Sequence, residues 1–261
     1  MQNNIMLMLL IVGHLSGDYY FQSEKLVTKK NEKCWFVIKH SIIYSFCILV
    51  LLLPIFNIKV LVAFLIVSIS HFLIDLVKMK INNYSCEYPT FCWIKRNIFC
   101  LDQLLHIAIL ITIAFIYATY NIVALNCIGA FMLSVYHNVT QYSPVKTFCL
   151  LTILLIIGKP ANIIIREMNK KEAEKEENEE VKADEIKDIE VNDDKAKSDN
   201  VKAGRLIGIL ERMLIVILLI VGQYTAIGLV FAAKSLTRFD KISKDSKFAE
   251  YYLIGLSLIH I

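Results

Sequence analysis

Each aspartate in the first 165 residues has a histidine four positions away. The pairs are His14–Asp18, His71–Asp75 and Asp102–His106. On an α-helix, positions i and i+4 lie on one face, one turn apart, so each pair can present two ligand atoms to the same point. Imidazole and carboxylate together suit divalent zinc, manganese, iron, cobalt or nickel. We therefore assign metal binding to these six residues, with zinc as the expected ion.

Other polar residues of the same region extend this site. With His40 included, four histidines and three aspartates exceed the four ligands of one tetrahedral ion. Either two metals bind, or some members orient ligands or act as general bases. We expect catalytic roles for His40, as an additional ligand or proton-transfer group, and for Asp75. Gln22 and Gln103 are candidates for binding polar atoms of a substrate.

The elements that carry these residues are long apolar segments. Hydrophobic residues make up 56% of the 261-residue chain and the mean hydropathy is +0.55, above the 45–50% apolar content of an average soluble domain. The sequence predicts an all-α fold, a polytopic transmembrane bundle of about six to eight segments. The expected segments are about 5–21, 35–56, 60–77, 99–120, 122–136 and 145–165, followed by the run 206–238. That last run forms a helical hairpin, two half-helices or one long tilted helix.

A charged linker divides the chain. Between Arg166 and Arg205 there are 10 basic and 14 acidic residues and no aromatic residue, so disorder or a solvated helix is expected there. We predict an N-terminal membrane domain over residues 1–165 that holds the His/Asp site, a linker over 166–204, and C-terminal membrane segments over 205–261. The linker is a possible binding arm for a protein partner.

Lysine and arginine near the segment ends predict the orientation. The loops after the first and third segments are rich in lysine, whereas the loops after the second and fourth are not. The positive-inside rule places the first and third loops in the cytoplasm. In an up-and-down bundle, all the His/Asp positions then meet at one level on the cytoplasmic side. Six full crossings would place the linker outside, whereas the lysine-rich C-terminal region also has the character of a cytoplasmic segment, which favours a re-entrant fifth, sixth or seventh segment.

Composition excludes several classes of protein. Seven cysteines without a paired CxxC spacing argue against a disulfide-rich secreted domain and a thiolate zinc motif. The net charge of +4 combines an acidic linker with a moderately basic remainder. The chain is therefore not expected to bind nucleic acid. Its expected partners are the lipid bilayer and a lipid-linked or anionic substrate.

Four motifs resemble a known family. The segments "GHLSGDYYFQSEKL", "IKHSIIYSF", "SHFLIDLVK" and "LDQLLH" resemble the bacterial membrane family catalogued as domain of unknown function 3307. The resemblance implies a multi-pass protein of the bacterial cytoplasmic membrane. The later segments "GRLIGILERMLIVILLIVGQYTAIGLVFAAKSLTRF" and "FAEYYLIGLSL" resemble longer members. The polar residues matched there are Arg205, Glu211, Arg212, Gln223, Lys234, Arg238 and Glu250.

The His/Asp pattern leaves several functions open. It resembles, loosely, integral-membrane metal-dependent hydrolases, and ionisable residues inside membrane segments are functional by default. The leading hypothesis is a hydrolase that acts on a membrane-associated ester, amide or phosphoester. The alternatives are a divalent-metal transporter or sensor and a non-catalytic membrane scaffold. In the scaffold, the same side chains form a structural hydrogen-bond network. Polar residues clustered at one level favour a closed site over a transport path.

Overall fold

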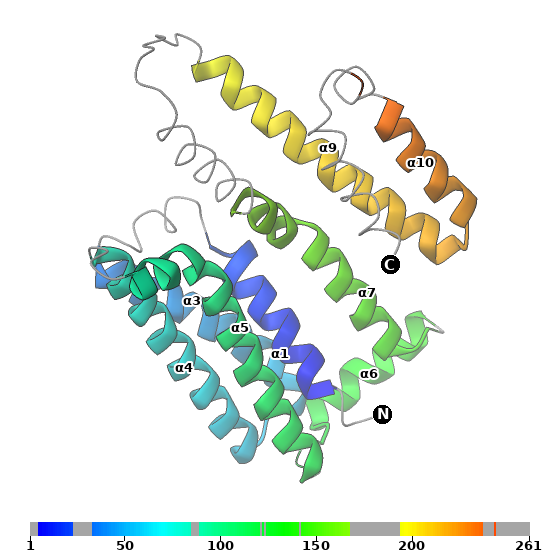
Figure 1. Cartoon of the computed structure of the whole chain (residues 1–261). Coiled ribbons are helices and arrows are strands. Elements are labelled where there is room, and N and C mark those ends of the chain that lie inside the picture. The colour runs from blue at the N-terminus through cyan, green and yellow to red at the C-terminus, as the bar shows by residue number, and fades with distance from the viewer. Residues whose placement is uncertain are drawn as a thin grey trace. The chain divides into compact units, whose positions relative to one another are not determined.

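All regular secondary structure in the described part of the chain is helical, which confirms the predicted all-α class. The computed structural model describes residues 5–22, 33–84, 89–120, 122, 124–140, 142–167, 194–236 and 243. The helices are α1 (Ile5–Leu15), α3 (Cys34–Leu52), α4 (Ile58–Asn83), α5 (Pro89–Thr119), α6 (Cys127–Val139), α7 (Pro144–Ile157), α9 (Asp194–Val221) and α10 (Tyr224–Leu236) (Figure 1). The chain divides into two compact units, residues 1–190 and 191–261.

Four helices of the first unit close into a bundle. Helix α1 packs against α3 and α5, α3 packs against α4, and α4 packs against α5 (Figure 1). Neighbouring helices are antiparallel. For example, Lys78 near the end of α4 meets Asp102 midway along α5, and Tyr117 near the end of α5 bonds the carbonyl of Lys59 at the start of α4. Helix α7 lies outside this ring, against α1.

One buried stripe runs along each helix of the bundle. On α4 it comprises Val60, Ala63, Val67, His71 and Asp75, at steps of three or four residues. This is the spacing of a helix face turned toward a core. The other three helices repeat the pattern, and the apolar members together form one continuous core. The stripe changes from apolar to ionisable at the same end of the bundle in every helix, as the up-and-down prediction required.

Two glycines allow α1 to lie close to α3. A Cβ atom at Gly13 would lie 2.6 Å from the Ile48 side chain, and one at Gly17 would lie 2.9 Å from the Tyr44 ring and 3.2 Å from the Tyr44 Cα. Small residues four apart let helix backbones approach closely in membranes. His14 and Asp18 directly follow the two glycines, so the close approach also brings these two residues to the α3 surface.

Helix α1 ends in a π-helical turn, Ser16–Tyr20, in which the Phe21 N–H donates to the Ser16 carbonyl at 2.9 Å. Such turns occur often at functional sites, and this one carries Asp18. Its last residue is held from outside: the Tyr20 hydroxyl donates to the Leu155 carbonyl at 2.8 Å and accepts from the Lys159 N–H at 3.3 Å. The contact falls where α7 ends, at Gly158.

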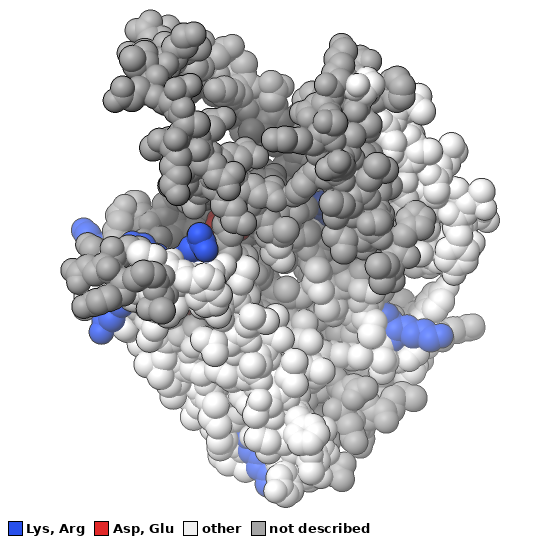
Figure 2. Space-filling view, viewed as in Figure 1, with Lys and Arg blue, Asp and Glu red and all other residues white. Residues whose placement is uncertain are grey.

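Four described helical segments are long and apolar enough to cross a membrane: Cys34–Ile55, Ile58–Asn83, Phe91–Thr119 and Pro144–Glu167. Three more apolar helices are shorter, Ile5–Tyr20, Cys127–Val139 and Tyr224–Leu236. The predicted count of six to eight segments is therefore met only in part. The outer surfaces of α3, α4 and α5 expose large apolar side chains such as Phe46, Ile69 and Phe115, and the described surface in Figure 2 is mostly uncharged. A bundle with polar residues inside and apolar residues outside is typical of a membrane protein.

The second unit contains a helical hairpin, one of the three forms predicted for residues 206–238. Helix α9 ends at Val221, Gly222 adopts a positive φ of 76°, and α10 begins at Tyr224. Glycine takes this backbone conformation without a Cβ clash. Helix α10 returns along α9, and the Lys234 ammonium pairs with the Glu211 carboxylate across the hairpin. Of the charged linker, residues 168–193 lie outside the described residues and residues 194–204 belong to α9.

We predict that Gly17→Ala destabilises the bundle by roughly 1–3 kcal/mol, the usual cost of overpacking. The added methyl group meets both the Tyr44 ring and its backbone, so α1 has to move away from α3. Thermal denaturation in detergent, followed by circular dichroism, measures the effect.

The matched control is Gly228→Ala in α10, where a Cβ atom has no neighbour within 4 Å. This substitution should leave the midpoint unchanged or slightly raised, because alanine favours helix over glycine. Equal midpoints for Gly17→Ala and the parent would contradict the close helix contact.

Candidate metal centre

The ionisable ends of the four stripes meet in one cluster, called here the His–Asp centre. It consists of His14, Asp18, His40, His71, Asp75, Asp102 and His106. Six of the seven are at most 5% exposed, and the Asp18 side chain is 11% exposed. The structure thus brings together all six residues predicted to bind metal and His40. Uncompensated charge in such a place is costly, so these groups must pair or bind an ion.

Carboxylates from two helices flank His40 and His71. The Asp18 Oδ1 atom lies 3.1 Å from the His40 Nε2 atom and 3.8 Å from the His71 Nε2 atom. The Asp75 Oδ2 atom lies 3.6 Å from the His40 Nε2 atom and 3.7 Å from the His71 Nδ1 atom. Only the Asp18–His40 contact is a hydrogen bond. Asp18 and Asp75 therefore share the His40 Nε2 atom and face different nitrogens of the His71 ring.

Helix α5 supplies the other end of the centre. The Asp102 Oδ1 atom lies 3.4 Å from the His106 Nε2 atom. The other oxygen of Asp102, Oδ2, accepts from the Lys78 ammonium at 2.6 Å and from the Gln103 amide at 3.1 Å. Lys78 comes from the last turns of α4 and gives the centre its one described cationic partner. One Asp102 oxygen is thus held by an ion pair, and the other faces an imidazole.

Gln103 links the two ends through all of its hydrogen-bonding positions. Its amide nitrogen donates to Asp18 Oδ2 at 3.0 Å as well as to Asp102, and its carbonyl oxygen accepts from the Tyr19 hydroxyl at 2.7 Å. The same oxygen lies 3.3 Å from the His14 Nε2 atom. Because this oxygen only accepts, the proton of neutral His14 belongs on Nε2. The Nδ1 atom of His14 is then an unprotonated nitrogen.

The imidazole rings are held by stacking. The Tyr44 ring lies on one face of His71, with centroids 3.6 Å apart and ring planes inclined by 17°. His106 lies at 4.4 Å from His71, with an inclination of 23°. Such contacts fix the plane of the His71 ring, and with it the directions in which its two nitrogens can bind a partner.

Several buried atoms of the centre have no hydrogen-bond partner. Among the described residues they are both ring nitrogens of His71, Nε2 of His106, Oδ1 of Asp102 and Nδ1 of His14 and His40. Buried polar atoms are normally bonded, so each such atom calls for an explanation. At zinc–ligand distances of 2.0–2.2 Å, two ligands of a tetrahedral ion lie about 3.3–3.6 Å apart. The nitrogen–oxygen distances of 3.4–3.8 Å in the centre are long for hydrogen bonds and close to this ligand spacing.

The donor atoms fall into groups compact enough to hold an ion. Among the described residues, three such groups have all their ligand atoms within 4.8 Å of one another: His14–Asp18–His71, His40–His71–Asp75 and Asp75–Asp102–His106. The first two groups share His71, and the last two share Asp75. Histidine and carboxylate donors, all of them at least largely buried, fit a divalent metal.

The two glutamines predicted to bind substrate have different positions. Gln22 lies just beyond the π-helical turn and is partly exposed, and the described contacts of the centre do not include it. Gln103 lies within the centre, and its amide already bonds four partners. In this arrangement Gln103 positions the carboxylates. Its binding to substrate stays a prediction.

Sequence reasoning missed three residues that surround the His–Asp centre: Lys78, Tyr19 and Tyr44. Lys78 belongs to a lysine-rich segment end that predicts orientation, yet it lies three positions after Asp75 and so on the same helix face. Tyr44 lies four positions after His40, which is again one turn along the buried face of α3. Helical spacing could have found both. The contact between Tyr19 and Gln103 depends on the π-helical turn, which spacing does not reveal.

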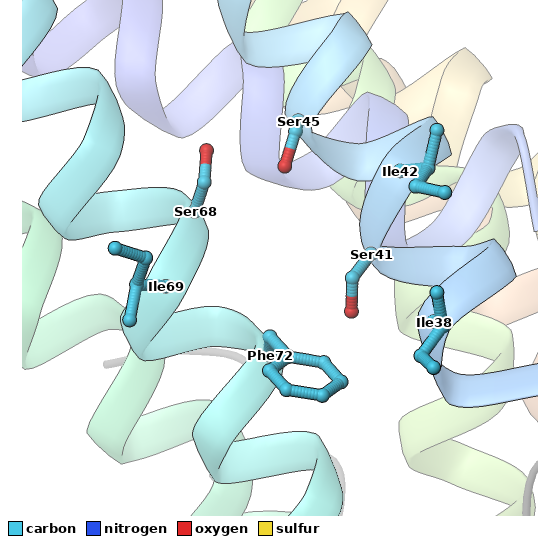
Figure 3. A pocket seen from close by; sticks show the side chains of 7 residues that line it. All are labelled: Ile38, Ser41, Ile42, Ser45, Ser68, Ile69 and Phe72. Atoms are coloured by element: carbon cyan, nitrogen blue, oxygen red, sulfur yellow. The ribbon is translucent and has the colours of Figure 1, made fainter. Parts of the chain in front are cut away.

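A groove lies along the outer side of the centre, between α3 and α4 (Figure 3). Its volume is about 370 Å³, and it is lined by Ile38, Ser41, Ile42, Ser45, Ser68, Ile69 and Phe72. Ser41 directly follows His40, and Phe72 directly follows His71, so the groove follows the helix turns that carry these two histidines. The Ser68 hydroxyl is buried and has no hydrogen-bond partner. The groove is therefore apolar, with a few polar positions.

Residues 6–128 match the model of a family described as a protein of unknown function, DUF3307. This confirms the predicted resemblance over the part of the chain that contains the four-helix bundle and every residue of the His–Asp centre. The resemblance noted for the C-terminal segments falls outside the matched residues. No curated protein and no solved structure matches the chain.

We predict that Gln103→Leu lowers the free energy of unfolding by roughly 2–4 kcal/mol. The substitution removes the amide donor from two buried carboxylates, and hydrogen bonds to charged groups contribute about 1.5–3 kcal/mol each. The thermal midpoint in detergent micelles measures the loss.

Gln223→Leu provides the control, because Gln223 is exposed at the start of the α10 hairpin. Its midpoint should stay within about 0.5 kcal/mol of the parent, as for most surface changes. A Gln103→Leu protein as stable as this control would show that the amide network contributes nothing to stability.

Proposed function

We propose that this protein is a membrane-embedded metalloprotein whose His–Asp centre binds a divalent metal, zinc above all, and hydrolyses a membrane-associated substrate. One observation carries the proposal: buried imidazole and carboxylate atoms of the centre face one another at 3.4–3.8 Å without hydrogen bonds. A purely structural network would be expected to close these distances into hydrogen bonds, because unpaired polar atoms in an apolar surrounding are costly.

The donor set nearest to the groove is formed by His40, His71 and Asp75, whose ligand atoms lie within 4.8 Å of one another. It supplies two nitrogens and one oxygen and leaves the fourth position of a catalytic zinc to water. Further groups orient these ligands: Asp18 bonds His40, and Gln103 holds the second oxygen of Asp18. Such partners of the ligands tune both metal affinity and ligand basicity.

A metal held in this set would activate a water molecule and polarise the bond to be cleaved. Hydrolysis consumes that water: its oxygen bonds to the acyl carbon or phosphorus, the bond to the leaving group breaks, and the proton passes to the leaving atom. Asp18 lies outside this donor group, with its Oδ1 atom 3.1 Å from the His40 Nε2 atom, and is suited to accept the proton. Asp18, the most exposed member, marks the side from which water and substrate would approach.

The surroundings support a substrate that partitions into the membrane. The centre lies within apolar helices of membrane-spanning length, and the α3–α4 groove could take the apolar part of such a molecule beside His40 and His71. Between the centre and the opposite end of the bundle, at Tyr117 and Val60, the buried stripes are apolar. An apolar core on that side supports a closed catalytic site over a transport path for ions.

Metal binding is tested by elemental mass spectrometry on detergent-purified protein. We expect stoichiometric divalent metal in the parent and a reduction in metal affinity of about tenfold or more in His71→Ala, by the scale known for residues that support metal ligands. His137→Ala is the matched control, since His137 is exposed on α6 and should retain the metal. Metal-free parent protein that stays folded and takes up no added zinc would leave the centre as a structural network.

Hydrolysis is tested with p-nitrophenyl butyrate and bis-p-nitrophenyl phosphate in mixed micelles. We expect Asp75→Asn, which replaces a ligand carboxylate by an amide, to slow turnover by at least the 10–100-fold known for groups that support metal ligands, and a chelator to abolish turnover until zinc is restored. Undiminished turnover by Asp75→Asn would sink the assignment. A metal-loaded parent that cleaves neither ester but carries zinc into proteoliposomes would establish the transporter instead.

A further inference from the structure

We infer that the His–Asp centre holds two divalent ions bridged by Asp75, and that its substrate carries an anionic group of the phosphate type. This inference rests on the proposed function and deepens it. It begins with the stacked pair His71 and His106, whose ring centroids are 4.4 Å apart with planes inclined by only 23°.

Stacked imidazoles cannot share one metal ion. A neutral imidazole binds a metal through a nitrogen lone pair in the plane of the ring, which puts the ion about 3 Å from the ring centre at a metal–nitrogen distance of 2.0–2.1 Å. Two planes that are stacked and nearly parallel do not meet at that distance. His71 and His106 therefore point to two different positions. Tyr44 covers the other face of His71 at 3.6 Å and resists a rotation that would bring the two rings onto one ion.

The donor atoms divide in the same way. His40, His71 and Asp75 form the first group, and Asp75, Asp102 and His106 form the second; in each group the ligand atoms lie within 4.8 Å of one another. Asp75 belongs to both groups, and a carboxylate has two oxygens with which to join two ions. His14 forms a further group with Asp18 and His71. Three protein donors at each position leave room there for water or substrate.

Charge then indicates the class of substrate. With neutral histidines, the three aspartates and Lys78 together carry a net charge of −2. One divalent ion would make the centre neutral, whereas two ions leave it at +2. An excess of positive charge in apolar surroundings is costly, and a hydroxide together with an anionic substrate group would balance it. Paired metal ions that stabilise both the attacking and the leaving oxygen are characteristic of enzymes that cleave phosphoesters.

The test is metal stoichiometry in detergent, after equilibration with buffered zinc. We expect about two ions per chain in the parent and in the His137→Ala control, and about one in His106→Ala. Saturation of the parent at one ion, or two ions in a folded His106→Ala protein, would overturn the inference. Loading with Mn²⁺ gives a second measurement, the magnetic-resonance spectrum of the bound ions, which a change in folding alone does not reproduce. Bridged ions should give a coupled magnetic-resonance spectrum in the parent, and His106→Ala should restore the six-line spectrum of a single ion.

Added inorganic phosphate and phosphatidate test the charge argument. At least one of them should bind the two-ion parent and bind His106→Ala at least tenfold more weakly. Tighter binding of phosphatidate would identify a lipid headgroup as the source of the phosphate, and equal binding a soluble one. If neither binds the parent, the phosphate assignment is wrong.

The outcomes separate this inference from the proposed function. One ion with zinc-dependent hydrolysis would refute the bridged pair and retain the hydrolase. Two ions without hydrolysis of any ester would do the reverse.

Discussion

The rest of the structure depends on the need to bury seven ionisable side chains inside helices whose outer surfaces are apolar. Each of these groups would be costly alone in such surroundings, so they must meet one another at one level. The closed order α1–α3–α4–α5 achieves this with antiparallel neighbours. The ionisable positions lie late in α1, in the second half of α4, in the first half of α3 and midway along α5, and the alternating helix directions bring them to the same level. Fold and site are therefore two results of one pattern, a buried stripe that changes character partway along each helix.

Two local features adjust α1 to this pattern. Gly13 and Gly17 bring its backbone against Ile48 and Tyr44, and the π-helical turn then places Asp18 within reach of both His40 and His71. A regular α-helix would keep Asp18 one turn above His14, on a single stripe. The extra residue of the turn changes that register, so that Asp18 pairs across the bundle. The regular α-helix is interrupted at the residue whose carboxylate contacts histidines on two other helices. π-Helical turns occur often at functional sites.

Helical periodicity accounts for what could be predicted from the sequence and for what could not. The pairs His71–Asp75 and Asp102–His106 lie within α-helices, and both contact as their spacing predicted. The convergence of all seven residues followed from the alternating up and down directions of successive helices. The partners of Asp18 did not follow, because the π-turn is invisible in residue spacing. Lys78 was missed because a lysine near a segment end reads first as a topology signal, although its place one turn after Asp75 was available. The number of crossing segments also stayed open, since a 16-residue apolar helix such as Ile5–Tyr20 fits either a short crossing or a partial one.

The distribution of hydrogen bonds within the centre separates supporting groups from reactive ones. Gln103 and Lys78 satisfy one oxygen each of Asp18 and Asp102 and leave the other oxygen of each carboxylate facing an imidazole. A network built only for stability would use every donor and acceptor, because each unmade bond costs free energy. Here Gln103 and Lys78 make these outer bonds, whereas the unmade bonds among the described residues of the centre lie at Asp102 Oδ1 and at ring nitrogens of His14, His40, His71 and His106. Supporting hydrogen bonds around donor atoms that do not bond one another are the arrangement that holds metal ligands at fixed distances before the metal binds. The same arrangement explains why the unsatisfied atoms are imidazole nitrogens and carboxylate oxygens, the two donor types that a divalent ion joins.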